Sequence, residues 1–233
     1  MKLKKENKKL SIILFFVISE CILLCCFVVA PFTFIKRVDE PTESFVIVVD
    51  AGHGGIDGGV TGVVTKVKES DLNLLTSKEL KKQLESRGAF VVMTRKDKNG
   101  LYGNPASGFK LRDMKKRREI IQESNPDLVV SIHMNKFSDS GRSGPQVFFQ
   151  SGDEKSKQFA QSVQQTLNQF TDNAHQALRG DFYICQCADV PSIIVECGFL
   201  SNPTEEALLC DSKYRAKLCD AILKGIFLYL YSV

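Results

Sequence analysis

The chain has 233 residues, of which 43% are hydrophobic and 25% are charged, and its formal net charge is +4. Seven basic and two acidic residues fall within 1–37, so the 24 basic and 25 acidic residues of the remainder nearly cancel. This composition is typical of a globular protein with one sizeable domain. The nearly neutral remainder lacks the basic surface that nucleic-acid binding requires, and we expect no nucleic-acid partner.

The N-terminal residues carry a targeting signal. Residues 1–9 form a basic tail with five lysines, and residues 10–35 are apolar except at four positions. Because roughly 20 apolar residues cross a bilayer and positive charge stays on the cytoplasmic side, we expect a cytoplasmic tail followed by a transmembrane anchor. A cleaved signal segment is the alternative, but Pro31 directly after the small residue Ala30 disfavours cleavage. In both cases the rest of the chain is exported, either anchored to the outer face of the cytoplasmic membrane or secreted.

A polar linker, residues 36–44, leads to a domain that we expect to span residues 45–233. Apolar runs predict strands at 45–50, 89–94, 128–133, 146–150, 182–187 and 192–197. Helical periodicity predicts helices at 69–87, 111–124, 153–170, 203–210 and 213–231. This alternation indicates a single α/β domain with a mostly parallel central sheet flanked by helices.

Polar side chains that metals favour follow three of the predicted strands. His53 comes after the first strand, and His133 and Glu196 end the third and the last. Glu69 opens the first long helix. Because the carboxyl ends of parallel strands share one edge of a sheet, we expect these four residues to lie close together. Two histidines and two glutamates fit a catalytic zinc site, in which three ligate the metal and the fourth acts as a base.

Each of these residues alone also fits a structural role. A histidine after a strand commonly hydrogen-bonds within a loop, and Glu69 suits the first turn of a helix because of the helix dipole. Glu196 could be a paired carboxylate of the core. The glycines of residues 52–59 could cradle a phosphate, but the Lys-Ser/Thr pair of a P-loop does not follow them.

Four segments together carry a resemblance to a known family. They are DAGHGGIDGG (50–59), KESDLNL (68–74), LVVSIHMN (128–135) and IIVECGFLSNP (193–203). In this order they resemble the zinc-dependent N-acetylmuramoyl-L-alanine amidases of the amidase-3 type, over about residues 45–230. The resemblance implies that His53, Glu69 and His133 bind Zn²⁺ and that Glu196 is catalytic. It also implies hydrolysis of the amide bond between N-acetylmuramic acid and L-alanine in bacterial peptidoglycan.

A single catalytic domain behind one apolar segment resembles the germination-specific amidases of spore formers. That resemblance implies modification of the spore cortex towards muramic δ-lactam, in the forespore intermembrane space. Two alternatives stay open: another zinc wall hydrolase, either a carboxypeptidase or a deacetylase, and a membrane-tethered peptidoglycan-binding or scaffold protein.

Three further expectations concern the surroundings of the site. Asp50 and Asn135 are adjacent to it in sequence, so one of them is expected to fix a histidine tautomer. The glycine-rich residues 54–68 predict a flexible stretch before Glu69, which an activator protein could order. His175 has no partner pattern and is expected at the surface.

Overall fold

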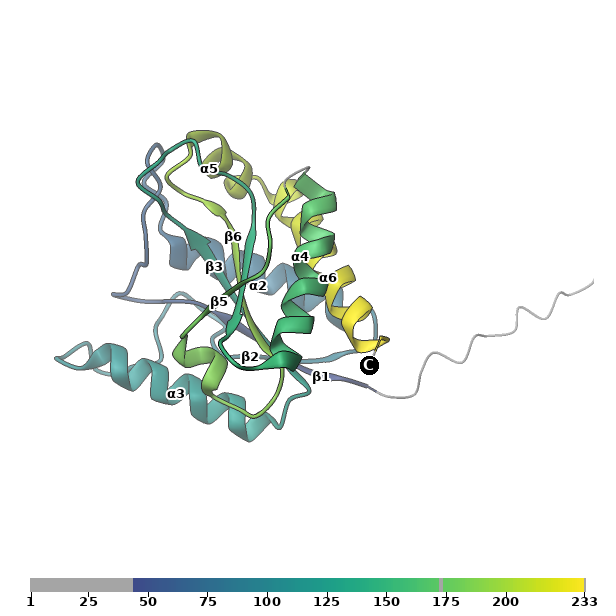
Figure 1. The fold of residues 1–233 in the computed structure, drawn as a ribbon. Helices are drawn as coiled ribbons and strands as arrows, with labels where there is room; N and C mark the ends of the chain where they lie inside the picture. The colour runs from purple at the N-terminus through teal and green to yellow at the C-terminus, as the bar shows by residue number, and fades with distance from the viewer. Residues whose placement is uncertain (1–43, 172–173, 233) are drawn as a thin grey trace, which may run out of the picture. The chain divides into compact units, whose positions relative to one another are not determined.

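A six-stranded sheet organises the part of the chain that the computed structural model describes, residues 44–171 and 174–232 (Figure 1). The predicted basic tail, the apolar segment 10–35 and the linker up to residue 43 lie outside these residues. No helix within the described ranges is both long and apolar enough to cross a membrane.

The sheet has the strand order β2-β1-β3-β6-β4-β5. The strands are β1 (Val46–Ala51), β2 (Phe90–Met93), β3 (Leu128–Asn135), β4 (Gln146–Gln150), β5 (Leu178–Gly180) and β6 (Ser192–Phe199). Neighbouring strands pair in parallel except β4 and β6, which are antiparallel. The sheet is therefore mixed, with a parallel half that contains β1, β3 and β6.

Helices cover both faces of this sheet (Figure 1). They are α2 (Glu69–Glu85), α3 (Phe109–Ser124), α4 (Glu154–Thr171), α5 (Pro203–Cys210) and α6 (Ser212–Leu230), with the 3₁₀ helix η1 (Tyr183–Gln186). The larger core lies between the sheet and α2, α4 and α6, and a smaller one lies between the sheet, α3 and η1. Because both faces are covered, β1, β3 and β6 are nearly continuous apolar runs.

One predicted strand is wrong. Residues 182–187 form the turn of η1, and the edge strand β5 lies just before them. Ile184 and Cys185 are adjacent and both buried in the smaller core. Neighbouring side chains of a strand point to opposite faces of the sheet, whereas a helical turn can bury both on one side.

The parallel half of the sheet determines where the site lies. Ala51 at the end of β1 pairs with Ile132, and the next residue of β3, His133, pairs with Glu196 of β6. The ends of β1, β3 and β6 therefore meet at one edge of the sheet, as the sequence predicts.

Candidate metal centre

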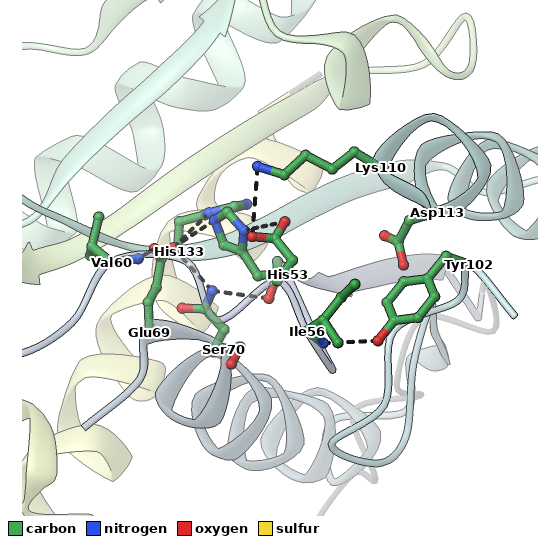
Figure 2. Close-up of polar contacts among 12 residues, drawn as sticks. His53, Ile56, Val60, Glu69, Ser70, Tyr102, Lys110, Asp113 and His133 are labelled. Atoms are coloured by element: carbon green, nitrogen blue, oxygen red, sulfur yellow. Dashed lines mark hydrogen bonds and ion pairs between the residues drawn. The ribbon is translucent and has the colours of Figure 1, made fainter. Parts of the chain in front are cut away.

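Three of the predicted site residues converge at this edge. His53 follows β1, Glu69 is the first residue of α2, and His133 lies in β3. Glu69 Oε1 is 2.9 Å from His133 Nδ1 and 3.3 Å from His53 Nε2, and one ligand atom of each residue lies within 4.8 Å of the others. Figure 2 shows the two rings beside the Glu69 carboxylate. Two imidazole nitrogens and one carboxylate oxygen form a donor set that could hold a divalent transition metal.

The electrostatics of these groups favour a cation between them. Burial acts to lower the pKa of His53, but hydrogen bonds with Glu69 and Asp57 outweigh it and raise that pKa to about 9. Burial acts to raise the pKa of Glu69, and its hydrogen bonds with His133 and His53 outweigh it, so that this pKa lies far below its usual range. A buried carboxylate that remains charged beside two imidazoles attracts positive charge, as a metal site requires.

Glu196 lies beside this cluster, opposite His133 in the parallel pairing of β3 and β6. Its Oε2 is buried and has no hydrogen-bond partner among the described residues. Burial raises the pKa of Glu196 to about 7; the neighbouring Glu69 adds to the rise and His133 opposes it. A carboxyl group with such a pKa can accept and return a proton near neutral pH.

Two glycines make room for the cluster. A Cβ atom on Gly52 would lie 2.2 Å from Nε2 of His133, so only glycine lets the imidazole cross the turn after β1. Gly59 has a φ of +64°, and a Cβ there would lie 2.3 Å from Oε2 of Glu69. His53 itself has a φ of +60°, a left-handed conformation that costs an L-residue roughly 1–2 kcal/mol.

The His53 ring is oriented by a residue that sequence reasoning missed. Asp57 Oδ2 lies 3.0 Å from Nδ1 of His53, which leaves Nε2 facing Glu69. The sequence predicts Asp50 or Asn135 in this role, and that prediction is wrong: among the described residues neither side chain hydrogen-bonds a histidine. Asp50 accepts hydrogen bonds from Thr94, Arg117 and Ser131, and the Asn135 side chain accepts one from the Lys136 amide. Asp57 follows His53 by four residues, and the reciprocal Gly54–Asp57 backbone bonds close the turn that brings it back.

The stretch between His53 and Glu69 is anchored rather than loose. Glu206 of α5 accepts hydrogen bonds from the amides of Val64 and Thr65, at 2.8 and 2.7 Å, and from the Thr65 hydroxyl. Nearer the site, the Val60 amide donates to Glu69 Oε2, and the Glu69 amide donates to the Val60 carbonyl (Figure 2). The expected flexible segment is thus fixed at two points.

A cavity of about 270 Å³ adjoins the two site histidines. Its apolar wall comes from α3 and from the residues around η1, and includes Phe109, Met114, Phe182 and Ile184. Lys110 of α3, labelled in Figure 2, also lines this cavity. Its Nζ lies 3.8 Å from Asp57 Oδ1. The third histidine, His175, lies elsewhere, in a loop where Nε2 is 2.8 Å from the Ser143 carbonyl oxygen.

Comparison with known proteins identifies the family. Residues 47–227 match the family described as N-acetylmuramoyl-L-alanine amidase. The chain belongs to this family. A germination-specific N-acetylmuramoyl-L-alanine amidase of Bacillus subtilis (strain 168) is 32% identical to this amidase over 194 residues, which is 81% of each chain.

Solved structures agree with this assignment. The CwlD amidase from Clostridioides difficile, solved in complex with the GerS lipoprotein, superimposes with a TM-score of 0.78 at 35% identity and covers 82% of this chain and 100% of that one. The catalytic domain of CwlV, an amidase from Bacillus (Paenibacillus) polymyxa, gives 0.70 at 29% identity, covering 80% and 98%. The resemblance identified from the four sequence segments is confirmed: the protein is an N-acetylmuramoyl-L-alanine amidase, whose substrate is peptidoglycan.

Proposed function

We propose that this amidase cleaves its substrate with Zn²⁺ held by His53, Glu69 and His133, and that Glu196 is its catalytic proton acceptor. The observation that supports the proposal most strongly is the convergence of two imidazole nitrogens and one carboxylate oxygen beside Glu196, whose buried Oε2 has no hydrogen-bond partner within the described part of the chain. Zinc held there would supply Lewis acidity, which polarises the lactyl carbonyl and lowers the pKa of water toward about 7.

The side chains then have distinct roles. Glu196 accepts a proton from the attacking water and returns it to the amine of L-alanine as the C–N bond breaks. Asp57 accepts a hydrogen bond from the Nδ1–H group of His53, so that the lone pair of Nε2 is free to face the metal. The cavity along α3 and η1 admits the part of the substrate next to the scissile bond and keeps bulk water from it.

The test uses residues 44–233, which contain the whole sheet and both cores, loaded with zinc and incubated with intact peptidoglycan. Mass analysis of the released material is expected to show peptides that begin with L-alanine. E196Q is expected to release them about 10²–10⁴ times more slowly while retaining zinc. Release of D-alanine or acetate would instead indicate a carboxypeptidase or a deacetylase, and would overturn the proposal.

We further propose that the amidase acts on the spore cortex, where removal of peptides prepares muramic acid for conversion to its δ-lactam. The support is the pair of similar proteins: a germination-specific amidase, and the CwlD amidase solved with a lipoprotein. Spores that lack the protein are expected to contain no muramic δ-lactam in their digested cortex. Normal δ-lactam content in such spores would contradict this role.

Export, anchoring and an activator partner belong to the same proposal. We infer from residues 1–35 that the enzyme acts outside the cytoplasmic membrane, with the apolar segment as its anchor. Carbonate extraction of membranes is expected to leave the full chain in the membrane fraction. A partner that assists zinc binding is expected to lower the zinc dissociation constant of the isolated enzyme, and unchanged zinc affinity with each exported lipoprotein of the native organism would contradict it.

A further inference from the structure

The backbone at His53 conflicts with the side chain that the site requires. A φ of +60° favours glycine, yet this position supplies an imidazole to the candidate metal centre. Other parts of the structure must therefore hold the residue in this conformation. Such restraints are expected on the peptide groups next to it, where hydrogen bonds control φ and ψ directly.

Three successive carbonyl groups around this residue are held by buried side chains. The Ala51 carbonyl accepts from Arg95 Nε and from Arg117 Nη1, both at 2.8 Å. The Gly52 carbonyl accepts from Asn73 Nδ2 at 3.1 Å and from Arg95 Nη2 at 2.9 Å. The His53 carbonyl accepts from Arg117 Nη2 at 2.6 Å. Of the three side chains, only Arg117 donates to the carbonyls of both Ala51 and His53, which lie on either side of Gly52. It therefore fixes the direction of the turn.

Arg117 has little freedom of its own. It is 1% exposed, and its Nε donates to Asp113 Oδ2 at 2.7 Å while Nη1 donates to Asp50 Oδ1 at 2.5 Å. Asp50 is held in turn by the hydroxyls of Thr94 and Ser131, both at 2.6 Å. The guanidinium is thus fixed by α3, β1 and β3 before it reaches the His53 carbonyl. A lysine at this position has no rigid fork and could not make these bonds together.

We propose that Arg117 is a positioning residue that holds the left-handed turn at His53 and thereby preforms the metal centre. The inference rests on the proposed metal site. It goes beyond that site by naming the residue that holds His53 in its metal-binding position when no metal is bound. Arg117 contacts neither the proposed metal ligands' donor atoms nor the scissile bond. It acts through the peptide group of His53.

The test is zinc affinity of R117K, measured by chelator competition on residues 44–233. We expect a dissociation constant at least tenfold higher than in the wild type, as for other residues that orient metal ligands. R215K is the matched control, because Arg215 is also a buried arginine that donates to a backbone carbonyl, that of Leu209, but lies on α6. Its zinc affinity is expected to be unchanged.

A second readout follows the histidine itself. The chain contains three histidines, so ¹⁵N-labelled imidazoles give three separable ring signals. In metal-free R117K the His53 signal is expected to shift or broaden, while His175 stays in place. Wild-type zinc affinity together with an unchanged His53 signal in R117K would overturn the proposal.

A milder variant covers the case in which R117K does not fold. In D113N the remaining carbonyl oxygen can still accept from the Leu101 amide, but the new amide cannot accept from Arg117 Nε. We expect zinc binding weakened about threefold to tenfold; wild-type affinity in folded D113N would overturn the inference. A wild-type enzyme that binds no zinc, alone or with the exported lipoproteins of the native organism, would instead refute the proposed function, so the two failures are distinct.

Discussion

His133 and Glu196 are paired in register across the parallel strands β3 and β6. Side chains at paired positions of neighbouring strands point to the same face of the sheet, about 5 Å apart at their origins. A candidate metal ligand and a carboxylate oxygen that has no hydrogen-bond partner among the described residues are therefore placed beside each other by two buried central strands. The spacing between them depends on backbone hydrogen bonds and not on a loop.

The pH dependence of activity is expected to follow the ionisation of Glu196. As a proton acceptor it must be charged, so kcat/KM falls as the pH drops through its pKa, with a limiting slope of one. That pKa is about 7 without metal, and a nearby cation lowers it in the loaded enzyme. Steady-state kinetics from pH 4 to 9 tests this. E196Q is expected to lose about 10²–10⁴ in rate at all pH values, and a residual acid limb in that variant would contradict the assignment.

The stability of the metal-free enzyme is expected to change with pH in the opposite direction to its activity. Because the pKa of Glu196 in the folded enzyme is about 7, above its ordinary value of 4.5, the folded state binds more protons between these pH values and loses stability as the pH rises through them. Across this pH range the contribution of Glu196 to the free energy of unfolding falls by about 3 kcal/mol. Urea unfolding at pH 4 and pH 8 in the presence of a chelator measures it. E196Q is expected to remove this part of the pH dependence; equal slopes in both proteins would refute the prediction.

Replacement of Asp57 by asparagine is expected to weaken zinc binding about 10- to 100-fold, since the acceptor that fixes the His53 tautomer becomes a weaker, neutral one. Folding should be little changed, because Asp57 is partly exposed. Chelator competition gives the affinity. D220N, a surface aspartate on α6 that pairs with Lys224, serves as the control and should bind zinc like the wild type.

Loss of Glu206 is expected to release residues 60–67 without unfolding the sheet. E206A removes the acceptor of three hydrogen bonds, from Val64, Thr65 and the Thr65 hydroxyl. Trypsin should then cut faster after Lys66, a site within the released segment. Mass analysis of a short digestion identifies the cut. Cleavage at the wild-type rate would show that the loop is held without Glu206.

The sequence was sufficient to predict that four polar residues meet at one edge of a sheet. Each follows or precedes an apolar run long enough to be a buried strand or helix, and parallel strands bring their ends together. The same reasoning predicted the ends of the helices to within a few residues of where the structure has them. It works because these elements are defined by apolar periodicity, which is local.

The parts that were wrong depend on contacts between distant residues. The apolar pattern around Ile184 and Cys185 predicts a strand. Both side chains are instead buried in a helical turn, because α3 packs against the sheet there. Asp57 was missed because its approach to His53 depends on left-handed glycines, whose φ angles no side-chain pattern reveals. The anchoring of residues 64–65 by Glu206, 141 residues further on, has no local signal.

Gly52 has a consequence for how this enzyme can vary. It contacts no substrate group in the proposed mechanism, yet even a methyl group there would collide with the His133 ring. In a library of all single substitutions, position 52 is expected to tolerate no replacement, as if it were itself a metal ligand. A lineage that altered it would have to displace either the His133 ring, and so a candidate metal ligand, or the end of β1, so the intolerance of this position comes from the space that the ring occupies.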